Sequence, residues 1–513
     1  MTKPAHLTEA EQGPQPRLLW LWLALLIVGS SIARIPLVDN DLLGPSEWRE
    51  VETATIARHF LEEPNIFYPR VNWGAPGPGY VETEFQLMPY VVHLLYRVFG
   101  YQPWLGQALA LGLAALATWL LFLLARRLMP PWTALAAAAA FGSAPLVFRY
   151  GASFMPEALT LVCYIASADR FVVWLQSRRW PAILAAGALL GLGILIKPTS
   201  IHLGLVGALV AFQRGGLKLT FGPQMLAFGA VALLPAVFWF THAAQLHHEY
   251  GNTFGVISGG DSKWGGWDSW LDPDFYLVVL QLDVLHGMRY IGTLFVVLAL
   301  FAARPLALRS GLWTWLAVLL VYYMIVARYA GHESRGLQYH VYAAVPLALA
   351  VGAGACALWQ LCGRWLSGQL VVRSLVVVLP LSGMLMEQWR ANDAFLATEK
   401  SDLFLRAGRA LASVSDAGDL VLVTSTDVAT EDGAVNNFEE PKVMFHAWRR
   451  GRIIARDRLT LDELQRVRGL IDARYLVLID QVFDGADEDL RQELLTWDVA
   501  ATEDGFHVLR VPQ

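Results

Sequence analysis

The sequence predicts a polytopic α-helical membrane protein that carries a small soluble α/β domain at its C-terminal end. Hydrophobic residues make up 55% of the 513 residues and charged residues only 16%, well below the roughly 25% charge of soluble proteins. The apolar residues gather in stretches close to the roughly 20 residues that a helix needs to cross a bilayer. Many of these stretches end in a pair of basic residues, as the cytoplasmic ends of membrane spans do.

About eleven apolar stretches are predicted to be transmembrane helices. They lie near residues 18–36, 104–125, 132–148, 156–176, 181–196, 199–213, 222–243, 279–302, 311–328, 340–361 and 369–388. With the N-terminus in the cytoplasm, every short inner loop is basic, as the positive-inside rule requires. The first stretch is not followed by a small-residue cleavage site, so we expect an uncleaved span rather than a signal peptide.

The predicted spans divide the chain into three parts. These are a cytoplasmic tail at 1–17, a transmembrane part at 18–390 with a long outer loop at 37–103, and an outer domain at 391–513. In the last part charges return, and strand-like and helix-like runs alternate. Strands are expected at 419–425, 452–456, 475–480 and 507–511, and helices at 402–413, 461–473 and 487–497, the second helix with Thr460 as its N-cap.

Charge and cysteine content exclude some functions. The net charge of −5 at pH 7 provides no basic surface for nucleic acid, so nucleic-acid binding is not expected. The three cysteines lie in or beside apolar stretches, and no disulfide is expected.

The first outer loop holds the densest group of candidate catalytic residues. The run SEWREVETATIARHF reads as a helix that begins near Ser46, with Glu47, Glu50 and Glu52 in its first turns. Residues two apart on a helix do not share a face, so at most one of Glu50 and Glu52 is a catalytic acid. Stabilisation of the helix N-terminus by negative charge is the alternative role.

Two further acidic positions flank that helix. Asp41, in the triplet Asp39-Asn40-Asp41, is a reserve candidate for a base or a metal ligand, against a solvated turn. No ligand spacing demands a metal, which leaves a divalent cation at the acidic loop open. Glu84 precedes an apolar segment at the membrane boundary, where we expect it to have a function or a basic partner from the same loop.

Basic residues near the predicted membrane boundary are candidates for binding a phosphate. Arg149 and Glu157 lie in the short second outer loop, and Lys197 interrupts an apolar stretch just before a proline. The run RYAGHESRGLQYHVY adds Arg335, Tyr339 and His340. Such cations suit an anionic head group, although helix capping, snorkelling and interface anchoring are the respective alternatives.

Together these segments resemble the GT-C glycosyltransferases, specifically the family 39 relatives of protein O-mannosyltransferases and of the lipid A aminoarabinose transferases of bacteria. The similar stretches are WREVETATIARHF, NIFYPRVNW, GYVETEFQLMPY, MPEALTL, ILIKPTS and QYHVYAAVP, in that order. The resemblance implies inverting transfer of a sugar from a polyprenyl-phosphate carrier to a lipid, glycan or protein acceptor. It also implies a bacterial inner membrane, with the reaction at the periplasmic face.

The resemblance also implies roles for individual residues. Glu52 matches the family's catalytic acid, with Glu50 beside it, and Glu84 and Glu157 match later acidic positions. Lys197, Arg335, Tyr339 and His340 would bind the donor phosphate, with Arg149 as a further substrate-binding candidate. The chain departs from the pattern at three positions, with glutamate in place of aspartate at 52 and 157 and glutamine in place of proline at 86.

Two other classes of protein share some of these features. A secondary transporter or flippase of an anionic or lipid-linked substrate would also have buried charges and a span broken near Pro198. A non-catalytic scaffold could use the outer domain to bind a partner. The absence of an internal repeat, the structured composition of the first outer loop and the outer C-terminal domain favour the enzyme over the transporter. Replacement of Glu52 and Glu157 by glutamine would distinguish the enzyme from a scaffold, because a scaffold would tolerate both changes.

Overall fold

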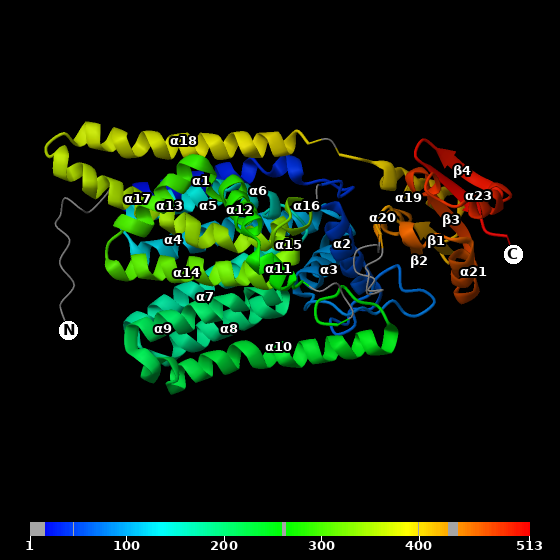
Figure 1. Ribbon diagram of the computed structural model, residues 1–513, viewed down its shortest axis with the longest axis horizontal. Coiled ribbons are helices and arrows are strands. Elements are labelled where there is room, and N and C mark those ends of the chain that lie inside the picture. The colour runs from blue at the N-terminus through cyan, green and yellow to red at the C-terminus, as the bar shows by residue number, and fades with distance from the viewer. Residues whose placement is uncertain (1–15, 45, 259–262, 399, 429–439, 513) are drawn as a thin grey trace. The chain divides into compact units, whose positions relative to one another are not determined.

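Long apolar helices account for most of the chain up to residue 398 in the computed structural model, which describes residues 16–44, 46–258, 263–398, 400–428 and 440–512 (Figure 1). Within these ranges, eight helical segments are long and apolar enough to cross a membrane. They are Arg17–Leu37, Trp104–Leu128, Glu157–Ser177, Pro223–Tyr250, Pro273–Ala302, Leu306–Ile325, Leu337–Trp365 and Leu370–Leu396. The chain is therefore a multi-pass membrane protein, as its composition predicts.

The three remaining predicted spans fall in shorter or interrupted helices. Residues 132–148 divide into α5 (Pro131–Ser143) and α6 (Pro145–Tyr150), because Pro145 cannot continue the hydrogen bonds of α5. Residues 181–196 form α8 (Trp180–Ile196), which Pro198 ends. The next stretch forms α9 (His202–Thr220), which contains a non-helical Gly215–Gly216 pair. The total of eleven spans stays a prediction.

The chain forms two compact units, which we call the helical unit and the mixed unit. The helical unit contains Met1–Leu37, Ala108–Ala236 and Ser262–Thr398, and the mixed unit contains Val38–Gln107, Val237–Asp261 and Glu399–Gln513. The remaining elements of the helical unit are α1 (Pro16–Ile32), η2 (Ile35–Leu37), α4 (Trp104–Leu128), α7 (Glu157–Ser177), η3 (Pro198–Ile201), α10 (Pro223–Tyr250), α11 (Gly266–Leu271), α12 (Pro273–Leu282), the π-helical η4 (Asp283–Met288), α13 (Arg289–Ala302), α14 (Leu306–Ile325), α15 (Ala327–Ala330), α16 (Glu333–Gly336), η5 (Leu337–Ala343), α17 (Ala344–Trp365) and α18 (Leu370–Leu396), with α4 and α10 also contributing residues to the mixed unit.

Small residues on α17 allow the helical unit to pack closely. In the span Leu337–Trp365, which contains α17, 89% of an apolar run of 18 residues is buried, so α17 lies at the centre of the unit. A Cβ atom on Gly354 would lie 2.1 Å from the Phe295 carbonyl oxygen of α13, so only glycine permits this approach.

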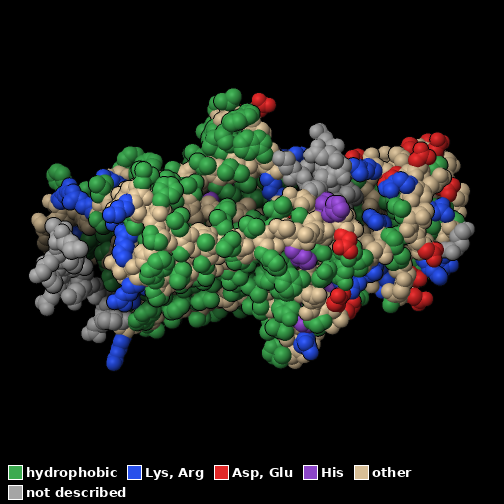
Figure 2. Space-filling model, turned by 90° about the horizontal axis from the view of Figure 1, so that it is seen from below, with side chains coloured by type: hydrophobic (Ala, Val, Ile, Leu, Met, Phe, Trp, Pro, Cys, Tyr) green, Lys and Arg blue, Asp and Glu red, His purple; other side chains and the backbone are tan. Residues whose placement is uncertain are grey.

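Hydrophobic side chains cover most of the visible face of the unit, with few acidic residues among them (Figure 2). This surface suits contact with lipid.

A five-stranded sheet forms the C-terminal part of the mixed unit, in the order β2-β1-β3-β5-β4. Strands β1 (Leu420–Thr424), β2 (Arg450–Ile454) and β3 (Ala473–Ile479) are parallel, and β4 (Val499–Glu503) and β5 (Phe506–Arg510) join antiparallel. The other elements of the unit are α2 (Glu47–Glu62), α3 (Leu87–Phe99), α19 (Leu403–Val414), α20 (Lys442–Ala447), η6 (Arg456–Arg458), α21 (Leu461–Leu470), α22 (Asp480–Phe483) and α23 (Glu488–Leu495). The predicted C-terminal α/β fold is confirmed.

The long first loop and the C-terminal sheet share one hydrophobic core. Ile56, Phe60 and Val71 of the loop belong to the same buried cluster as the apolar residues of β1 and β3. The loop backbone also pairs with the outer edge of β2, since the Ala75 amide donates to the Gly451 carbonyl at 3.2 Å and the Gly451 amide donates to the Asn72 carbonyl at 2.9 Å. The mixed unit is therefore built from segments far apart in the sequence.

Candidate active site

Three carboxylates of α2 occupy different environments. Glu52 is fully buried, and its Oε1 accepts a hydrogen bond from the Trp73 indole at 2.7 Å. Its Oε2 is buried and has no hydrogen-bond partner among the described residues. Burial raises the pKa of Glu52 to about 8, so this carboxyl is mostly protonated at neutral pH.

Glu50 points to a different partner, as expected for residues two apart on a helix. It is 2% exposed, and its Oε1 accepts from the Gln107 side-chain amide at 3.1 Å. The Gln107 side-chain oxygen in turn accepts from the Asp39 backbone amide at 2.8 Å. Glu50 therefore helps to connect the two ends of the first loop.

Glu47, the first residue of α2, combines partial exposure with an unused oxygen. Its side chain is 14% exposed, and Oε2 lies 3.5 Å from the Lys442 ammonium. Oε1 is buried and has no hydrogen-bond partner in the described parts of the chain. Burial raises the pKa of Glu47 to about 7, and Lys442 opposes the rise. A pKa near the working pH is the property that a general base needs. The sequence places Glu47 in the same acidic run but does not distinguish it from a dipole-stabilising residue.

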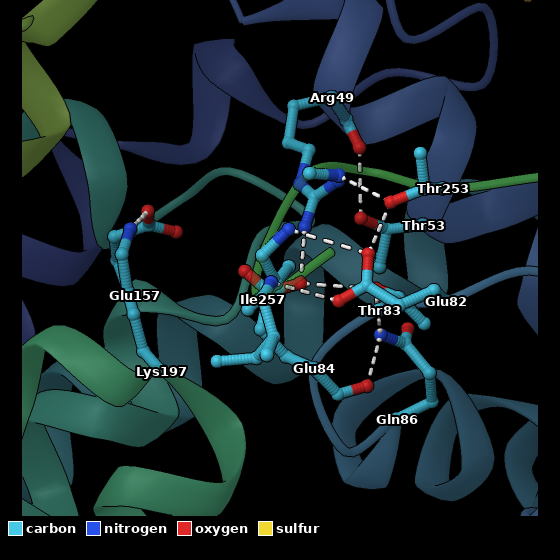
Figure 3. Close-up of polar contacts among 12 residues, drawn as sticks. Arg49, Thr53, Glu82, Thr83, Glu84, Gln86, Glu157, Lys197, Thr253 and Ile257 are labelled. Carbon is cyan, nitrogen blue, oxygen red and sulfur yellow. Dashed lines mark hydrogen bonds and ion pairs between the residues drawn. The ribbon is translucent and has the colours of Figure 1, made fainter. Parts of the chain in front are cut away.

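Glu84 forms the ion pair expected for a carboxylate at the membrane boundary. Its Oε2 lies 2.7 Å from the Arg49 guanidinium and accepts from the Thr83 hydroxyl at 3.0 Å (Figure 3). Gln86 donates to the Glu84 backbone carbonyl at 2.8 Å and to the Thr83 hydroxyl at 3.0 Å. Glutamine at this position thus supports the Glu84 segment through hydrogen bonds that a proline could not make.

Glu82 connects the first loop to the segment that follows α10. It is fully buried, accepts from the Thr253 hydroxyl and the Val256 amide with Oε2, and accepts from the Ile257 amide at 2.9 Å with Oε1 (Figure 3). These hydrogen bonds join two segments that lie about 170 residues apart in the chain. Glu82 therefore has a structural role.

In the helical unit, the structure brings Glu157, Lys197 and Tyr339 together. Glu157 begins α7, and Lys197 follows α8 in an extended conformation that the next residue, Pro198, favours. The Lys197 ammonium donates to Glu157 Oε1 (Figure 3) and lies 5.8 Å from the centre of the Tyr339 ring. Lys197 is 8% exposed and Glu157 is fully buried. Glu157 Oε2 has no partner among the described residues, so the cluster retains an acceptor for a ligand hydroxyl.

His340 is held by contacts within the protein. It is fully buried, with Nδ1 2.7 Å from Asp283 Oδ1 and Nε2 2.9 Å from the Ala330 carbonyl. Both ring nitrogens are therefore engaged, which suits a positioning role better than direct contact with a phosphate. Asp283 also accepts from the Tyr323 hydroxyl at 2.9 Å. It begins the π-helical turn η4 inside a candidate span, and a single acid in the apolar stretch 279–302 is the signal that could have found it.

The other predicted site residues lie elsewhere. Arg149, on α6, places its guanidinium over the rings of Tyr150 and Phe395. Asp41 is exposed and pairs with Arg409 at 2.9 Å, as a surface ion pair does. Arg335 lies in α16, and its side chain falls outside the described parts of the structure. Across the described residues, no three His, Cys, Asp or Glu side chains are grouped closely enough to hold a metal ion.

A comparison with known protein families finds a match to one part of the chain. The family described as dolichyl-phosphate-mannose-protein mannosyltransferase matches residues 86–239. This range includes Glu157 and Lys197. The comparison with curated proteins finds no match.

Several solved structures have a similar fold at low sequence identity. ArnT from Cupriavidus metallidurans, bound to undecaprenyl phosphate, is 15% identical with a TM-score of 0.60, over 98% of this chain and all of ArnT. AglB from Archaeoglobus fulgidus, in complex with an inhibitory peptide and a dolichol-phosphate, is 11% identical with a TM-score of 0.57, over 96% of this chain and 76% of AglB. The mycobacterial arabinofuranosyltransferase AftD is 14% identical with a TM-score of 0.50, over 98% of this chain and 40% of AftD.

AglB is described as an oligosaccharyltransferase and AftD as an arabinofuranosyltransferase. Their likeness to this chain agrees with the order of motifs in the sequence and with the helices and sheet described above. The chain is thus a multi-pass membrane protein with a fold like that of ArnT, and its residues 86–239 are similar to the dolichyl-phosphate-mannose-protein mannosyltransferase family.

Proposed function

We propose that this protein is an inverting glycosyltransferase that moves a sugar from a polyprenyl-phosphate carrier to a lipid, glycan or protein acceptor. The observation that carries the proposal is the buried Lys197 ammonium, which contacts Glu157 and faces Tyr339 within a fold like that of ArnT. Ionisable groups inside a membrane protein usually serve a substrate or a partner. The structures of ArnT and AglB, named above, contain polyprenyl phosphates, which carry the anionic group that such a cation would bind.

In this proposal the helical-unit cluster binds the donor. Lys197 contributes one of its three N–H donors to Glu157 and has the others for phosphate oxygens. A cation at this place stabilises the charge that develops on the departing polyprenyl phosphate. Arg149 and Arg335 are further candidates for the same anion, and Glu157 Oε2 can accept from a sugar hydroxyl.

The general base in this proposal belongs to α2. It removes the proton of the acceptor hydroxyl while that oxygen forms a bond to the anomeric carbon, and the bond from that carbon to the phosphate oxygen breaks with its electron pair. Inversion needs one such carboxylate. Glu47 is favoured over Glu52 and Glu50, because among these three only the Glu47 side chain is partly exposed, and its pKa is about 7.

The proposal includes the site of action. The transfer takes place at the periplasmic face of a bacterial inner membrane, with the N-terminus in the cytoplasm and the C-terminal sheet in the periplasm. The basic inner loops support this orientation.

Comparison of envelope glycans and glycolipids by mass spectrometry tests the proposal. Cells that lack the protein should lose one sugar-bearing species, which the wild-type chain should restore. Lys197→Met and Glu47→Gln should fail to restore it at equal protein levels. Glu62→Gln is the matched control, because Glu62 lies on the same helix with a 52% exposed side chain and should not matter.

Two outcomes would contradict the proposal. One is a set of glycans and glycolipids that is identical with and without the protein. The other is full restoration by both Lys197→Met and Glu47→Gln.

A further inference from the structure

A lysine from the C-terminal part of the mixed unit reaches the acidic end of α2. Lys442 begins the short helix α20, and its ammonium lies 3.5 Å from Glu47 Oε2 and 3.4 Å from Glu440 Oε2. The same ammonium lies 3.8 Å from the centre of the Phe404 ring. Its side chain is only 13% exposed, so two carboxylates and an aromatic ring replace most of the water that would surround the ammonium.

This contact differs from an ordinary surface ion pair. Exposed pairs contribute little to stability and tolerate loss of either partner. Here the cation and both carboxylates are largely buried, with Glu440 3% exposed. Loss of the cation would leave two neighbouring acids without their shared counter-charge, which is the more costly situation.

Lys442 is also the cation that α20 supplies to this region. His446 lies one turn further along α20, but burial, aided by the positive charges of Arg409 and Lys442, lowers its pKa to about 4. It is therefore neutral at working pH. The charged groups that act on Glu47 are Lys442, Glu440 and Asp39, and of these only Lys442 is positive.

We propose that Lys442 is a positioning residue for acceptor activation, whose ammonium fixes Oε2 of Glu47 and leaves Oε1 to take the proton of the acceptor hydroxyl. This inference rests on the proposed function and adds a contribution from the C-terminal part to the transfer step. The proton moves to Glu47 as the acceptor oxygen bonds to the anomeric carbon and polyprenyl phosphate leaves. Solvent then receives the proton.

The proposed role has a pH signature. Burial raises the pKa of Glu47, Lys442 opposes that rise, and Glu440 and Asp39 add to it. Removal of Lys442 should raise the pKa of Glu47 further. Because a base acts only when it is deprotonated, the acid limb of kcat/KM for transfer should move to higher pH.

The experiment measures both the carboxyl and the reaction in the full-length protein in lipid nanodiscs. A carbodiimide with a nucleophilic amine labels protonated carboxyls, and peptide mass spectrometry gives the pH midpoint of labelling at Glu47. In Lys442→Met we expect that midpoint to rise by about one pH unit, which corresponds to about tenfold less ionised Glu47 at pH 6. The loss of transfer should therefore be about tenfold greater at pH 6 than at pH 9.

Three further variants serve as controls for the effect of Lys442→Met on the labelling midpoint. Lys442→Arg should restore the wild-type midpoint, and Arg406→Met, which removes an ion pair with Asp402 and Glu503, should leave it unchanged. Glu440→Gln should move the midpoint the other way, to lower pH, because it removes a neighbouring negative charge. This variant decides the matter if Lys442→Met does not fold.

Failure of this inference can be told apart from failure of the proposed function. Equal labelling midpoints in all variants, or a loss of transfer by the same factor at every pH, would overturn the role of Lys442. Labelling requires no substrate, so a wild-type protein that transfers no sugar would overturn the proposed function while the labelling still tests the contact.

Discussion

At the scale of single residues, burial assigns different chemical states to carboxylates that look equivalent in the sequence. Glu47 and Glu52 lie five positions apart on α2, yet one is partly exposed and the other is enclosed beside Trp73. The sequence indicates that both are acids near a helix start. It cannot show which of the two side chains is shielded from water, because Trp73, which contacts Glu52, lies 21 residues away from it in the sequence.

Glu52→Gln should stabilise the protein at alkaline pH and leave transfer largely intact. The pKa of Glu52 is raised to about 8 in the folded chain. Its contribution to the free energy of unfolding is therefore complete below the pKa that this carboxyl has in the unfolded chain, and it is lost as pH rises through about 8. An amide stays neutral and can still accept from Trp73. Thermal unfolding followed by tryptophan fluorescence should show the variant gaining up to about 1.4 kcal/mol per pH unit over wild type within that window. Loss of transfer by a well-folded Glu52→Gln protein would instead identify Glu52 as the base.

The Lys197–Glu157 pair should show strong coupling in a double-mutant cycle. Lys197→Met and Glu157→Gln should each lower stability by about 3 kcal/mol, because each single change leaves an uncompensated buried charge. The double variant should recover most of that stability but not donor binding, which should stay at least tenfold weaker. Melting temperatures and the binding of a polyprenyl phosphate measure the two effects. Additive losses of stability would mean that the two residues do not interact.

Part of this site was within reach of the sequence. Lys197 and Glu157 were each recognisable as charges at apolar boundaries, and α7 and α8 are joined only by the short turn at Arg178 and Arg179. A tight helical hairpin places the start of its first helix beside the end of its second, so the pairing follows from local geometry. The contact between His340 and Asp283 spans 57 residues and depends on packing that periodicity does not reveal.

At the scale of elements, strands that bury several of their residues were predictable, including the mixed strands β2 and β5, whereas the largely exposed strand β4 was not. β1 and β3 are buried along most of their length and lie where the sequence places them. β4 was missed because its residues, VAATE, are largely exposed and carry no alternating pattern. Helix α20 was missed because its six residues provide less than two turns of periodicity.

Gly451→Ala should disrupt the edge of the sheet, whereas Gly469→Ala should strengthen a helix. A Cβ atom at Gly451 would lie 1.8 Å from the Val421 carbonyl oxygen, so β1 and β2 could not keep their pairing. Gly469 lies in α21 with no atom within 4 Å of an added Cβ, and alanine there should add about 0.5–1 kcal/mol. Thermal melting of the two variants is the measurement. Equal stability of Gly451→Ala and wild type would contradict the pairing.

At the scale of the whole molecule, the first loop needs the C-terminal part to complete its core. A chain that ends after Thr398 lacks every strand that packs on Ile56, Phe60 and Val71. We expect trypsin to cut the truncated chain at Arg58 and Arg70 at least tenfold faster than the full-length protein, because the opened loop exposes its backbone. Mass spectrometry of the fragments measures the difference, with Gly469→Ala in the full-length chain as a resistant control. Equal resistance of the truncated chain would show that the loop folds without the sheet.

Composition predicts the overall class of the molecule, but it does not predict which segments of the chain pack together into each compact unit. Hydropathy separates apolar helices from polar segments, and it correctly predicts many spans and a change of fold at the C-terminal end. It contains no information about which polar segments pack together. The joining of residues 38–107 with the C-terminal sheet is therefore a result of the structure alone.

The pairing of Asn72 and Ala75 with Gly451 also bears on how a cell makes this protein. A ribosome completes the first loop hundreds of residues before it reaches β2, and in that interval the loop has apolar side chains and backbone donors that nothing yet covers. Exposed edges of this kind invite pairing with other chains. Nascent chains should therefore depend on chaperones until translation is nearly finished, and premature termination would leave a product prone to aggregate.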